Sequence, residues 1–188
     1  MTRIKHQVQL KDNINNKMVT GYLSTPVNNK NIKEADKWKD FIKAYYKKDS
    51  EDAHWKWGIK KIESTKSIQI KTYAIEKDNI TQGMMVLKLT PYKSRQYEGR
   101  GLVYVDYLAG APWNRKYKNK EDVFVFPQYS LVGTHFIRVA KAESIDMGYN
   151  LLGLSALPDA EDFYRKSEFV QIGENTGDCG LNYFELKL

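Results

Sequence analysis

The segment of residues 123–169 constrains the fold most, because its apolar residues change from helical spacing to strand spacing and back again. After a turn that ends at Gly133 and Thr134, a set of apolar residues recurs at the spacing of one helix face. They are Phe136, Val139, Ala140 and Met147. Gly148 stands where a helix commonly ends in a left-handed residue. This pattern predicts a helix from Gly133 to Gly148.

A strand and a second helix are expected after that helix. Residues 151–154 form a short apolar run with the length of a strand. Asp159 can cap a helix that carries Phe163 and Tyr164. The order of strand end, turn, helix, strand and helix predicts a mixed α/β fold.

The turn at Gly133 is a candidate anion site. The first N–H groups of a helix lack acceptors within the helix, and the helix dipole favours negative charge beside them. Gly133 would let a ligand approach without a side chain in the way. A single glycine also occurs at plain loop-to-helix turns, so both interpretations stay open at this point.

Residues 128–133 resemble the signature of the GNAT acetyltransferase superfamily, in which Gln or Arg is followed by two residues, Gly, one residue, and Gly or Ala. Gln128 and Gly133 match, and Leu131 stands where the first Gly is usual. The signature lies between the central strand and the main helix of that family. We prefer Gln128 to Arg115 for its first position, because Gln128 has the right distance to Gly133.

Further segments extend the resemblance over residues 34–188. Residues 160–166 look like the family's A-x-x-F-Y helix, whose usual Gly-Phe ending is here Glu168-Phe169. Three segments are similar to one bacterial branch of the superfamily. They are residues 53–57 (AHWKW), 81–85 (TQGMM) and 111–115 (APWNR).

This resemblance implies a single domain over residues 1–188, with a central mixed, mostly antiparallel sheet of about six to seven strands flanked by helices. Residues 1–33 would be an extension or a first strand. The implied cofactor is acetyl-CoA, and the implied reaction is transfer of its acetyl group to a primary amine on a small molecule or a protein. The amine would attack directly, without a covalent enzyme intermediate.

The resemblance also implies which residues hold the cofactor. The main chain of the strand before the signature would bind the pantetheine arm, through Leu108, Ala109 and Ala111. The pyrophosphate would lie on main-chain N–H groups at the helix start. The residues expected there are Gln128, Leu131, Val132, Gly133 and Thr134.

Two residues are candidates for proton transfer. Tyr164 matches a position where the family often has a tyrosine, and a phenol could return a proton to the departing thiolate. Asp106 interrupts an apolar strand, where a carboxylate is costly unless it is hydrogen-bonded or used, so it is the candidate base. The alternatives are that Tyr164 packs beside Phe163 and that Asp106 binds a Tyr or a Lys.

Two other function classes stay open. The departures at Leu131 and Glu168 allow a module that binds acyl-CoA or a partner without catalysis. Leu131 can offer its N–H to a phosphate provided that its backbone needs no positive φ. The net charge of +7 and the 13% of aromatic residues raise nucleic-acid binding, but the lysines are spread along the chain and no known module is visible.

Composition adds several expectations. Cys179 is alone, so no internal disulfide can form, which suits a reducing compartment. No apolar run approaches the roughly 20 residues that span a bilayer, and residues 1–13 lack the centre of a signal peptide. We therefore expect a cytoplasmic protein. His6, His54 and His135 lie far apart in the sequence, so no metal site is expected. Whether the protein forms a homodimer is left open.

The remaining elements are read from periodicity. Trp38, Phe41, Ile42 and Tyr45 predict one amphipathic helix over residues 34–48, after a polar linker at residues 28–31. A short helix capped by Ser50 should carry an apolar stripe of Trp55, Ile59 and Ile62. Strands are expected at residues 67–76, 83–89 and 101–109, and a closing hairpin at residues 169–188. Residues 114–125 read as an insertion that contains a basic cluster from Arg115 to Lys120. This cluster is either a solvated loop or a patch near the cofactor phosphates or the acceptor.

Overall fold

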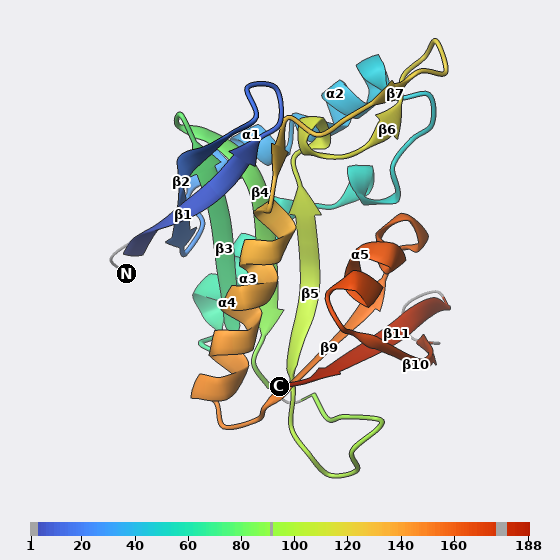
Figure 1. Ribbon diagram of the computed structural model, residues 1–188. Coiled ribbons are helices and arrows are strands. Elements are labelled where there is room, and N and C mark those ends of the chain that lie inside the picture. The colour runs from blue at the N-terminus through green and yellow to red at the C-terminus, as the bar shows by residue number, and fades with distance from the viewer. Residues whose placement is uncertain (1–3, 91, 176–179) are drawn as a thin grey trace.

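A large sheet organises the protein, with its nine strands in the order β10-β11-β9-β5-β4-β3-β2-β1-β8 (Figure 1). The computed structural model describes residues 4–90, 92–175 and 180–188. The strands of the sheet are β1 (Ile4–Asp12), β2 (Lys17–Thr25), β3 (Ile70–Lys77), β4 (Ile80–Lys88), β5 (Val103–Gly110), β8 (Tyr129–Ser130), β9 (Leu151–Ala156), β10 (Val170–Asn175) and β11 (Leu181–Lys187). All neighbours pair antiparallel except β5 and β9, so the mixed, mostly antiparallel sheet is confirmed and is larger than predicted.

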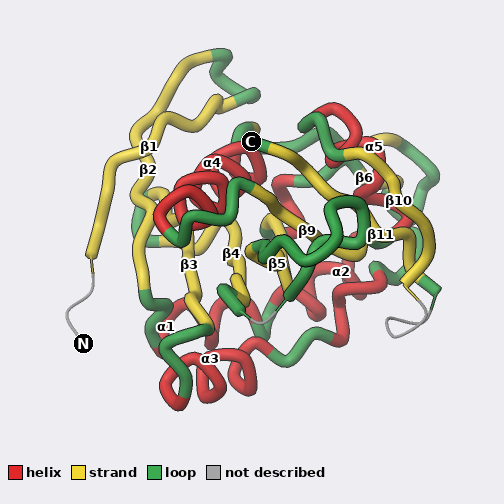
Figure 2. Tube along the Cα trace, turned by 90° about the horizontal axis from the view of Figure 1, so that it is seen from below, coloured by secondary structure: helices red, strands yellow, loops and turns green. Residues whose placement is uncertain are grey.

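Helices cover both faces of this sheet (Figure 2). The α-helices are α1 (Asn29–Ala35), α2 (Trp38–Tyr45), α3 (Trp57–Lys66), α4 (Val132–Asp146) and α5 (Glu161–Lys166). The 3-10 turns are η1 (Glu51–His54), η2 (Pro112–Asn114) and η3 (Pro158–Ala160), and β6 (Tyr117–Lys118) pairs with β7 (Phe124–Val125) in a small ribbon. Helices α1 to α3 lie on one face, and α4 and α5 pack on the other.

The N-terminal half of α4 packs closely against β4. Gly83 makes this approach available, because a Cβ there would lie 2.6 Å from Val132 and 2.9 Å from Phe136. Gly83 also pairs with Gly110 at the end of β5. The start of α4 therefore lies beside the C-terminal end of β5.

Strands β5 and β9 run parallel but stay together only briefly. They pair at Val103–Leu152 and at Tyr104–Gly153, and beyond these pairs β9 follows β11 while β5 follows β4. Asp106 is an extra residue in β5, since its neighbours Val105 and Tyr107 pair with consecutive residues of β4. Such a bulge bends a strand. The C-terminal half of β5 thus diverges from β9, as the ribbons in Figure 1 do above their point of contact.

The first residues form a hairpin that supports the turn before α4. Strand β1 pairs with β2 along its length and with β8 at Lys11–Ser130 and Asp12–Tyr129. The Asn13 amide donates to Pro127 O at 2.9 Å and to Ser130 Oγ at 2.7 Å. The segment expected as an extension or a first strand thus forms the β1–β2 hairpin, and its residues 11–13 brace the turn at the start of α4.

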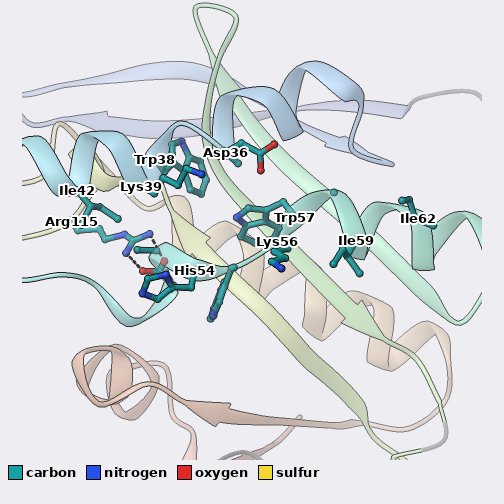
Figure 3. Close-up of a pocket in the computed structure, with 15 residues that line it drawn as sticks. Asp36, Trp38, Lys39, Ile42, His54, Lys56, Trp57, Ile59, Ile62 and Arg115 are labelled. Carbon is teal, nitrogen blue, oxygen red and sulfur yellow. Dashed lines mark hydrogen bonds and ion pairs between the residues drawn. The ribbon is translucent and has the colours of Figure 1, made fainter.

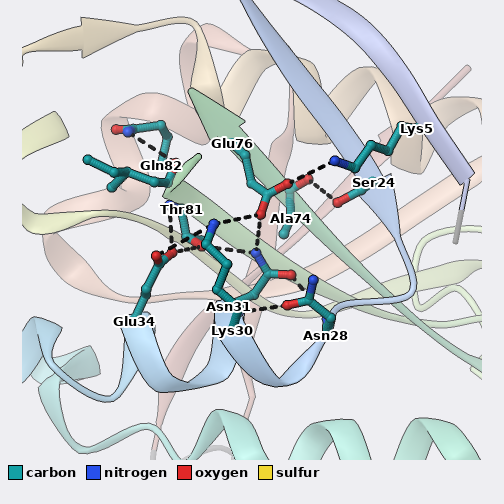
Figure 4. Close-up of polar contacts among 11 residues, drawn as sticks. Lys5, Ser24, Asn28, Lys30, Asn31, Glu34, Ala74, Glu76, Thr81 and Gln82 are labelled. Carbon is teal, nitrogen blue, oxygen red and sulfur yellow. Dashed lines mark hydrogen bonds and ion pairs between the residues drawn. The ribbon is translucent and has the colours of Figure 1, made fainter. Parts of the chain in front are cut away.

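Buried polar contacts fix α1 to the sheet (Figure 4). Glu76, on β3, accepts from the Asn31 amide at 3.0 Å and from Lys30 Nζ at 3.1 Å. The main-chain N–H of Thr81 donates to Glu34 at 2.8 Å. The predicted polar linker at residues 28–31 is therefore wrong, because Asn28 caps α1 and the helix begins at Asn29.

Two helix predictions need correction. The single helix over residues 34–48 is two helices, with a break between Ala35 and Trp38, and Tyr45 is exposed. In α3, Trp57 is buried while Ile59 and Ile62 are exposed, so the predicted inward stripe is wrong. Helical spacing gave the period but not the direction, because Trp57 fills the space beside Trp38 at 6.2 Å between ring centroids.

The C-terminal half follows the sequence more closely. Helix α4, its left-handed Gly148 and strand β9 lie where they were predicted, as does the β10–β11 hairpin. Met147 is exposed, and Ile137 takes a core position instead. Asp159 does not cap α5, whose N-cap is Ala160. Cys179 lies outside the described residues.

Glu168 has a positive φ of 70°, at the position where the resembling family has Gly. It follows the end of α5, where the Phe169 N–H returns to Tyr164 O at 3.1 Å. A left-handed conformation costs an L-residue roughly 1–2 kcal/mol, and glycine avoids most of this cost. The chain therefore has the local geometry of the family's Gly-Phe ending without the glycine.

We expect Glu168→Gly to raise the free energy of unfolding by about 0.5–1 kcal/mol, because it relieves this strain at some entropic cost. Chemical denaturation of both proteins would measure the change. Glu168→Ala is the matched control, since it removes the side chain and keeps the strain. Equal stability of the Gly and Ala variants would contradict the explanation.

Candidate functional site

The start of α4 presents main-chain donors. The His135 N–H bonds to Leu131 O at 3.0 Å, which closes the first turn of the helix. The N–H groups of Val132, Gly133 and Thr134 precede that bond and have no acceptor within residues 4–90, 92–175 and 180–188. Such groups, with the helix dipole, suit an anion.

Leu131 differs from the sequence-based expectation. Its φ is 75°, so the proviso that its backbone needs no positive φ is not met. The chain adopts the left-handed turn that a glycine would take easily, with a leucine that is 39% exposed. The geometry of the turn is retained, and the Leu131 side chain lies at the start of α4, where a glycine would leave open space.

Gly133 is required by packing. A Cβ at this position would lie 2.8 Å from the Phe163 ring of α5. The absence of a side chain thus brings α5 against the first turn of α4. The neighbouring residue on α5, Tyr164, is held in the same core. Gly133 therefore contributes to the arrangement whether or not a ligand touches it.

The main chain of β5 has an open side. The Ala111 N–H donates to Gln82 O at 2.8 Å, toward β4. Consecutive residues of a strand direct their backbone groups to opposite sides, so Leu108 and Gly110 direct theirs away from β4. Of the predicted main-chain contacts, Leu108 faces the side that β9 leaves open, whereas Ala109 and Ala111 face β4.

Gln128 lies in the segment that joins the insertion to the turn. Its N–H donates to Trp113 O at 2.8 Å, and its C=O accepts from the Asn13 N–H at 2.9 Å. Both main-chain groups are thus used to hold this segment between the first hairpin and η2. The structure brings Gln128 into the same neighbourhood as Leu131 through β8.

Tyr164 is buried in the core beneath α5. The residue is 6% exposed, and its ring packs edge-on against Phe163 and Phe169. Burial raises the pKa of Tyr164 above its ordinary value. Its hydroxyl makes no hydrogen bond to any residue of the described ranges. The phenol therefore stays protonated at neutral pH.

Asp106 lies between two lysines on the face that carries α3. Its carboxylate pairs with Lys60 Nζ at 3.2 Å and with Lys88 Nζ at 2.9 Å, and its side chain is 11% exposed. Burial alone would lower the pKa of Lys60 and Lys88, but Asp106 more than offsets it, and both pKa values are raised. The alternative that Asp106 binds a lysine is thus what the contacts show.

Arg115 has a role that the sequence did not reveal. It holds the Asp52 carboxylate with two bonds of 2.8 and 2.6 Å and also donates twice to Gly110 O, at 2.8 and 2.6 Å. Burial disfavours the Asp52 carboxylate, but Arg115 outweighs burial and holds the pKa of Asp52 below its ordinary value. No sequence signal joins these residues, which are 63 positions apart.

The basic cluster of residues 115–120 is therefore divided. Arg115 turns inward, while Lys116 lies over the Phe124 ring at 4.3 Å and Lys118 pairs with Asp122 at 3.0 Å. Gln82 connects two of the segments that carry the resemblance, since it accepts from Trp113 Nε1 at 2.9 Å and from the Asn114 amide at 2.8 Å. These contacts hold η2 against β4.

A cavity of about 550 Å³ lies among α1, α2, η1 and α3 (Figure 3). Its walls include Trp38, Trp55, Trp57 and Arg115. The Trp55 ring packs on Tyr107 of β5 at 4.4 Å, and Arg115 binds the end of the same strand. The cavity therefore borders the part of β5 that diverges from β9, on the face opposite α4.

The described ranges contain neither a metal-binding cluster nor a membrane-spanning helix. No group of three or more His, Cys, Asp and Glu side chains there is arranged to hold a metal ion. Within the same ranges, none of the helices has the length and apolar character needed to cross a membrane.

Known structures with the same architecture include acetyltransferases of the GNAT family. A protein of Desulfovibrio desulfuricans assigned to this family aligns with a TM-score of 0.62 at 14% identity, over 89% of this chain and 98% of its own. The PaiA N-acetyltransferase of Thermoplasma acidophilum, solved with coenzyme A, aligns with a TM-score of 0.58 at 12% identity, over 88% and 99%. A GNAT-family acetyltransferase of Listeria monocytogenes aligns with a TM-score of 0.53 at 14% identity, over 90% and 96%.

No family model matches the sequence, and no curated protein matches it either. The identities to the solved structures are low, so the likeness concerns the fold. The chain has the fold of the GNAT acetyltransferases, and the resemblance found in the sequence is confirmed at that level.

We expect Asp106→Asn to lower the free energy of unfolding by about 1–3 kcal/mol near neutral pH, because two ammonium groups lose their counter-ion. Since the pKa of each lysine is raised in the folded state, the stabilisation is complete below about pH 10.5 and is lost as the pH rises above it. The difference between the wild type and the variant should therefore shrink in alkali. Urea unfolding at a series of pH values would measure it.

Glu63→Gln is the control, because Glu63 also pairs with Lys60, at 3.3 Å, but is more exposed. It should change stability by less than about 1 kcal/mol. An Asp106→Asn variant as stable as the wild type at every pH would remove the structural role of this ion-pair group.

Proposed function

We propose that the protein is an acetyl-CoA-dependent N-acetyltransferase that acts on a primary amine. The observation that carries this proposal is the junction of two features at one end of the sheet. The main chain of β5 diverges from β9 there, and the open N-terminus of α4 lies beside it, joined through Gly83. A long ligand with a phosphate group and an amide-bearing arm would find partners for both parts.

The residues present fit acetyl-CoA, which supplies an activated acetyl thioester. The N–H groups of Val132, Gly133 and Thr134 would hold the pyrophosphate. Leu108 and its neighbours would hold the pantetheine arm by main-chain hydrogen bonds along the open side of β5. The solved complex of the PaiA enzyme with coenzyme A, in the same fold, supports this choice.

The proposed reaction is direct transfer. The amine nitrogen bonds to the acetyl carbon, the carbon–sulfur bond breaks, the amine loses a proton, and coenzyme A leaves as a thiol. An alkyl ammonium has a pKa of about 10, so the amine must lose a proton before it attacks. The reaction needs a group that accepts this proton and a group that protonates the thiolate.

Tyr164 is the proposed acid. Its burial keeps the phenol protonated, and its hydroxyl has no partner in the described ranges that would compete for the proton. Its place on α5, against the first turn of α4, puts it near the proposed cofactor site. The alternative role, packing between Phe163 and Phe169, uses the ring and leaves the hydroxyl unused.

Asp106 remains the proposed base, directly or through water. It lies at the bulge where β5 turns from β9, on the same face as the cavity. A base role predicts that Asp106→Asn flattens the acid side of the pH–rate profile. An unaltered profile would leave Asp106 with its ion pairs alone.

A second candidate is a binding module without catalysis, and Leu131 favours it. Its partly exposed side chain sits at the mouth of the α4 turn, where a glycine would leave space. In that case the fold would serve to bind acyl-CoA or a partner.

The bacterial origin, the cytoplasmic location and the single-domain organisation over residues 1–188 also stay proposals.

Calorimetric titration with acetyl-CoA and with coenzyme A tests the cofactor. We expect a dissociation constant in the micromolar range or tighter for both, corresponding to about −8 kcal/mol. A folded protein that binds neither would overturn the enzyme proposal. If the wild type binds neither ligand, Leu131→Gly distinguishes a site blocked by the leucine from a fold that has no cofactor site. Recovery of binding in this variant would mean that the leucine closes the site.

The acid role of Tyr164 has its own test. We expect Tyr164→Phe to lower kcat at least about tenfold, a loss of 1.4 kcal/mol of transition-state stabilisation, with little change in the dissociation constant of acetyl-CoA. Thiol release gives the rate, and calorimetry gives the binding. Phe163→Leu is a control for packing at the same place. Unchanged turnover in Tyr164→Phe would remove the acid role.

A further inference from the structure

The Arg115 guanidinium is fixed between the end of β5 and the carboxylate of Asp52. Its Nε and Nη2 atoms donate to Gly110 O at 2.8 and 2.6 Å. Its Nη1 and Nη2 atoms donate to the two oxygens of Asp52 at 2.8 and 2.6 Å (Figure 3). One planar group therefore binds a strand carbonyl and a carboxylate at the same time.

The carbonyl that Arg115 occupies lies on the open side of β5. Gly110 is the last residue of β5, and its main-chain groups point away from β4, toward the side that β9 leaves after Tyr104. Hydrogen bonds from a charged donor are roughly twice as strong as those between neutral groups. A neutral amide N–H is therefore a weak competitor of Arg115 for Gly110 O.

The partners of Arg115 on η1 hold it in this position. The Asp52 side chain is only 7% exposed, and the Ser50 hydroxyl donates to the same carboxylate. Ser50 Oγ also accepts from Arg115 Nη1 at 3.2 Å. The bond to Gly110 is thus supported from the far side by η1 and is not a chance contact of a free side chain.

The open side of β5 would otherwise offer the same acceptor twice. Leu108 and Gly110 direct their carbonyls to this side, and residues two apart in a strand are separated by about 6.6–6.8 Å. The proposed pantetheine arm carries two amide groups, whose N–H groups need acceptors. With both carbonyls free, the arm could bind at two positions along β5. Because Arg115 occupies Gly110 O, the carbonyl of Leu108 is the one that the arm can use.

Neither packing nor the proposed phosphate site would exclude the displaced position. A Cβ at Gly110 would meet no atom of the described residues within 4 Å, so the space beside it is open. The start of α4 lies beside this end of β5. A flexible arm could therefore withdraw toward Gly110 while its pyrophosphate stays on α4. The thioester would then stop about 6.7 Å short of its place near the bulge at Asp106.

We propose that Arg115 is a positioning residue that sets where the acyl thioester stops along β5, by keeping Gly110 O from the pantetheine arm. Asp52 holds Arg115 in that role. This role rests on the proposed acetyl-CoA site, which it deepens. Arg115 acts through the main chain of β5 and makes no contact with the reacting atoms.

Fluorine NMR of a bound analogue tests the position directly. S-Trifluoroacetonyl coenzyme A is a thioether that cannot transfer its acyl group, so no acceptor is needed. We expect one bound resonance in the wild type and two in Arg115→Ala, because the fluorinated end then stops at two places. The dissociation constant should be unchanged or up to about twofold lower, since a second equivalent position adds to binding.

Two results for Arg115→Ala would overturn the proposal. One is a single bound resonance that stays single on cooling, whether or not its shift has moved. The other is a loss of affinity of about tenfold or more, which would mean that Arg115 contacts the cofactor itself.

Further variants keep the test open if Arg115→Ala does not fold. In Arg115→Lys, one ammonium group cannot hold Gly110 O and both oxygens of Asp52, so a second but weaker resonance is expected. Asp52→Asn should give a similar result, because the guanidinium loses its counter-ion. Arg100→Ala is the matched control, an exposed arginine before the other end of β5 whose guanidinium lies over Tyr97 at 5.9 Å. It should keep one resonance.

Steady-state kinetics give an independent readout with any amine that the wild type acetylates. In Arg115→Ala, kcat and KM for acetyl-CoA should fall by the same factor, about twofold or more, because complexes in the displaced position bind without reacting. A merely structural role would lower kcat/KM instead. If the wild type binds neither the analogue nor acetyl-CoA, the proposed cofactor site fails, and the positioning role fails with it. If the wild type binds both and Arg115→Ala shows one resonance, the positioning role fails alone.

Discussion

The early divergence of β5 from β9 is the constraint on which the site depends. Two parallel pairs hold the strands together, and each strand then follows its antiparallel partner. Antiparallel pairing is somewhat more stable per residue than parallel pairing, and the bulge at Asp106 bends β5 further. The open side of β5 is a consequence of how the sheet is paired, and any function of its main-chain groups follows from that pairing.

Three groups of contacts keep this arrangement in place. Gly83 admits α4 to the end of β5, and Gly133 admits α5 to the start of α4. Arg115 ties the last carbonyl of β5 to Asp52, so the end of the strand is fixed to the wall of the cavity. Lys60 and Lys88 neutralise the carboxylate at the bulge. Through Arg115, the end of β5 that borders the proposed cofactor site is thus joined to the wall of the cavity on the opposite face of the sheet.

The departures from the family pattern at Leu131 and Glu168 have one physical meaning. Both residues take the left-handed conformation that a glycine takes readily. The turns are determined by the surrounding contacts, such as the β1–β8 pairing before α4 and the return bond from Phe169 to Tyr164. The fold therefore tolerates the strain of about 1–2 kcal/mol at each position and keeps its geometry.

The sequence by itself determined the extent of α4, β9 and the final hairpin, because these depend on local period and on glycine placement. It also carried the resemblance that the fold bears out. It did not determine which face of α3 is buried, because Ile59 and Ile62 share the helical period with a core stripe while Trp57 alone matches the space beside Trp38. Only the tertiary structure joined Asp52 to Arg115 and Asp106 to Lys60 and Lys88. Contacts between residues distant in the chain leave no local pattern, since they depend on how strands pair and helices pack.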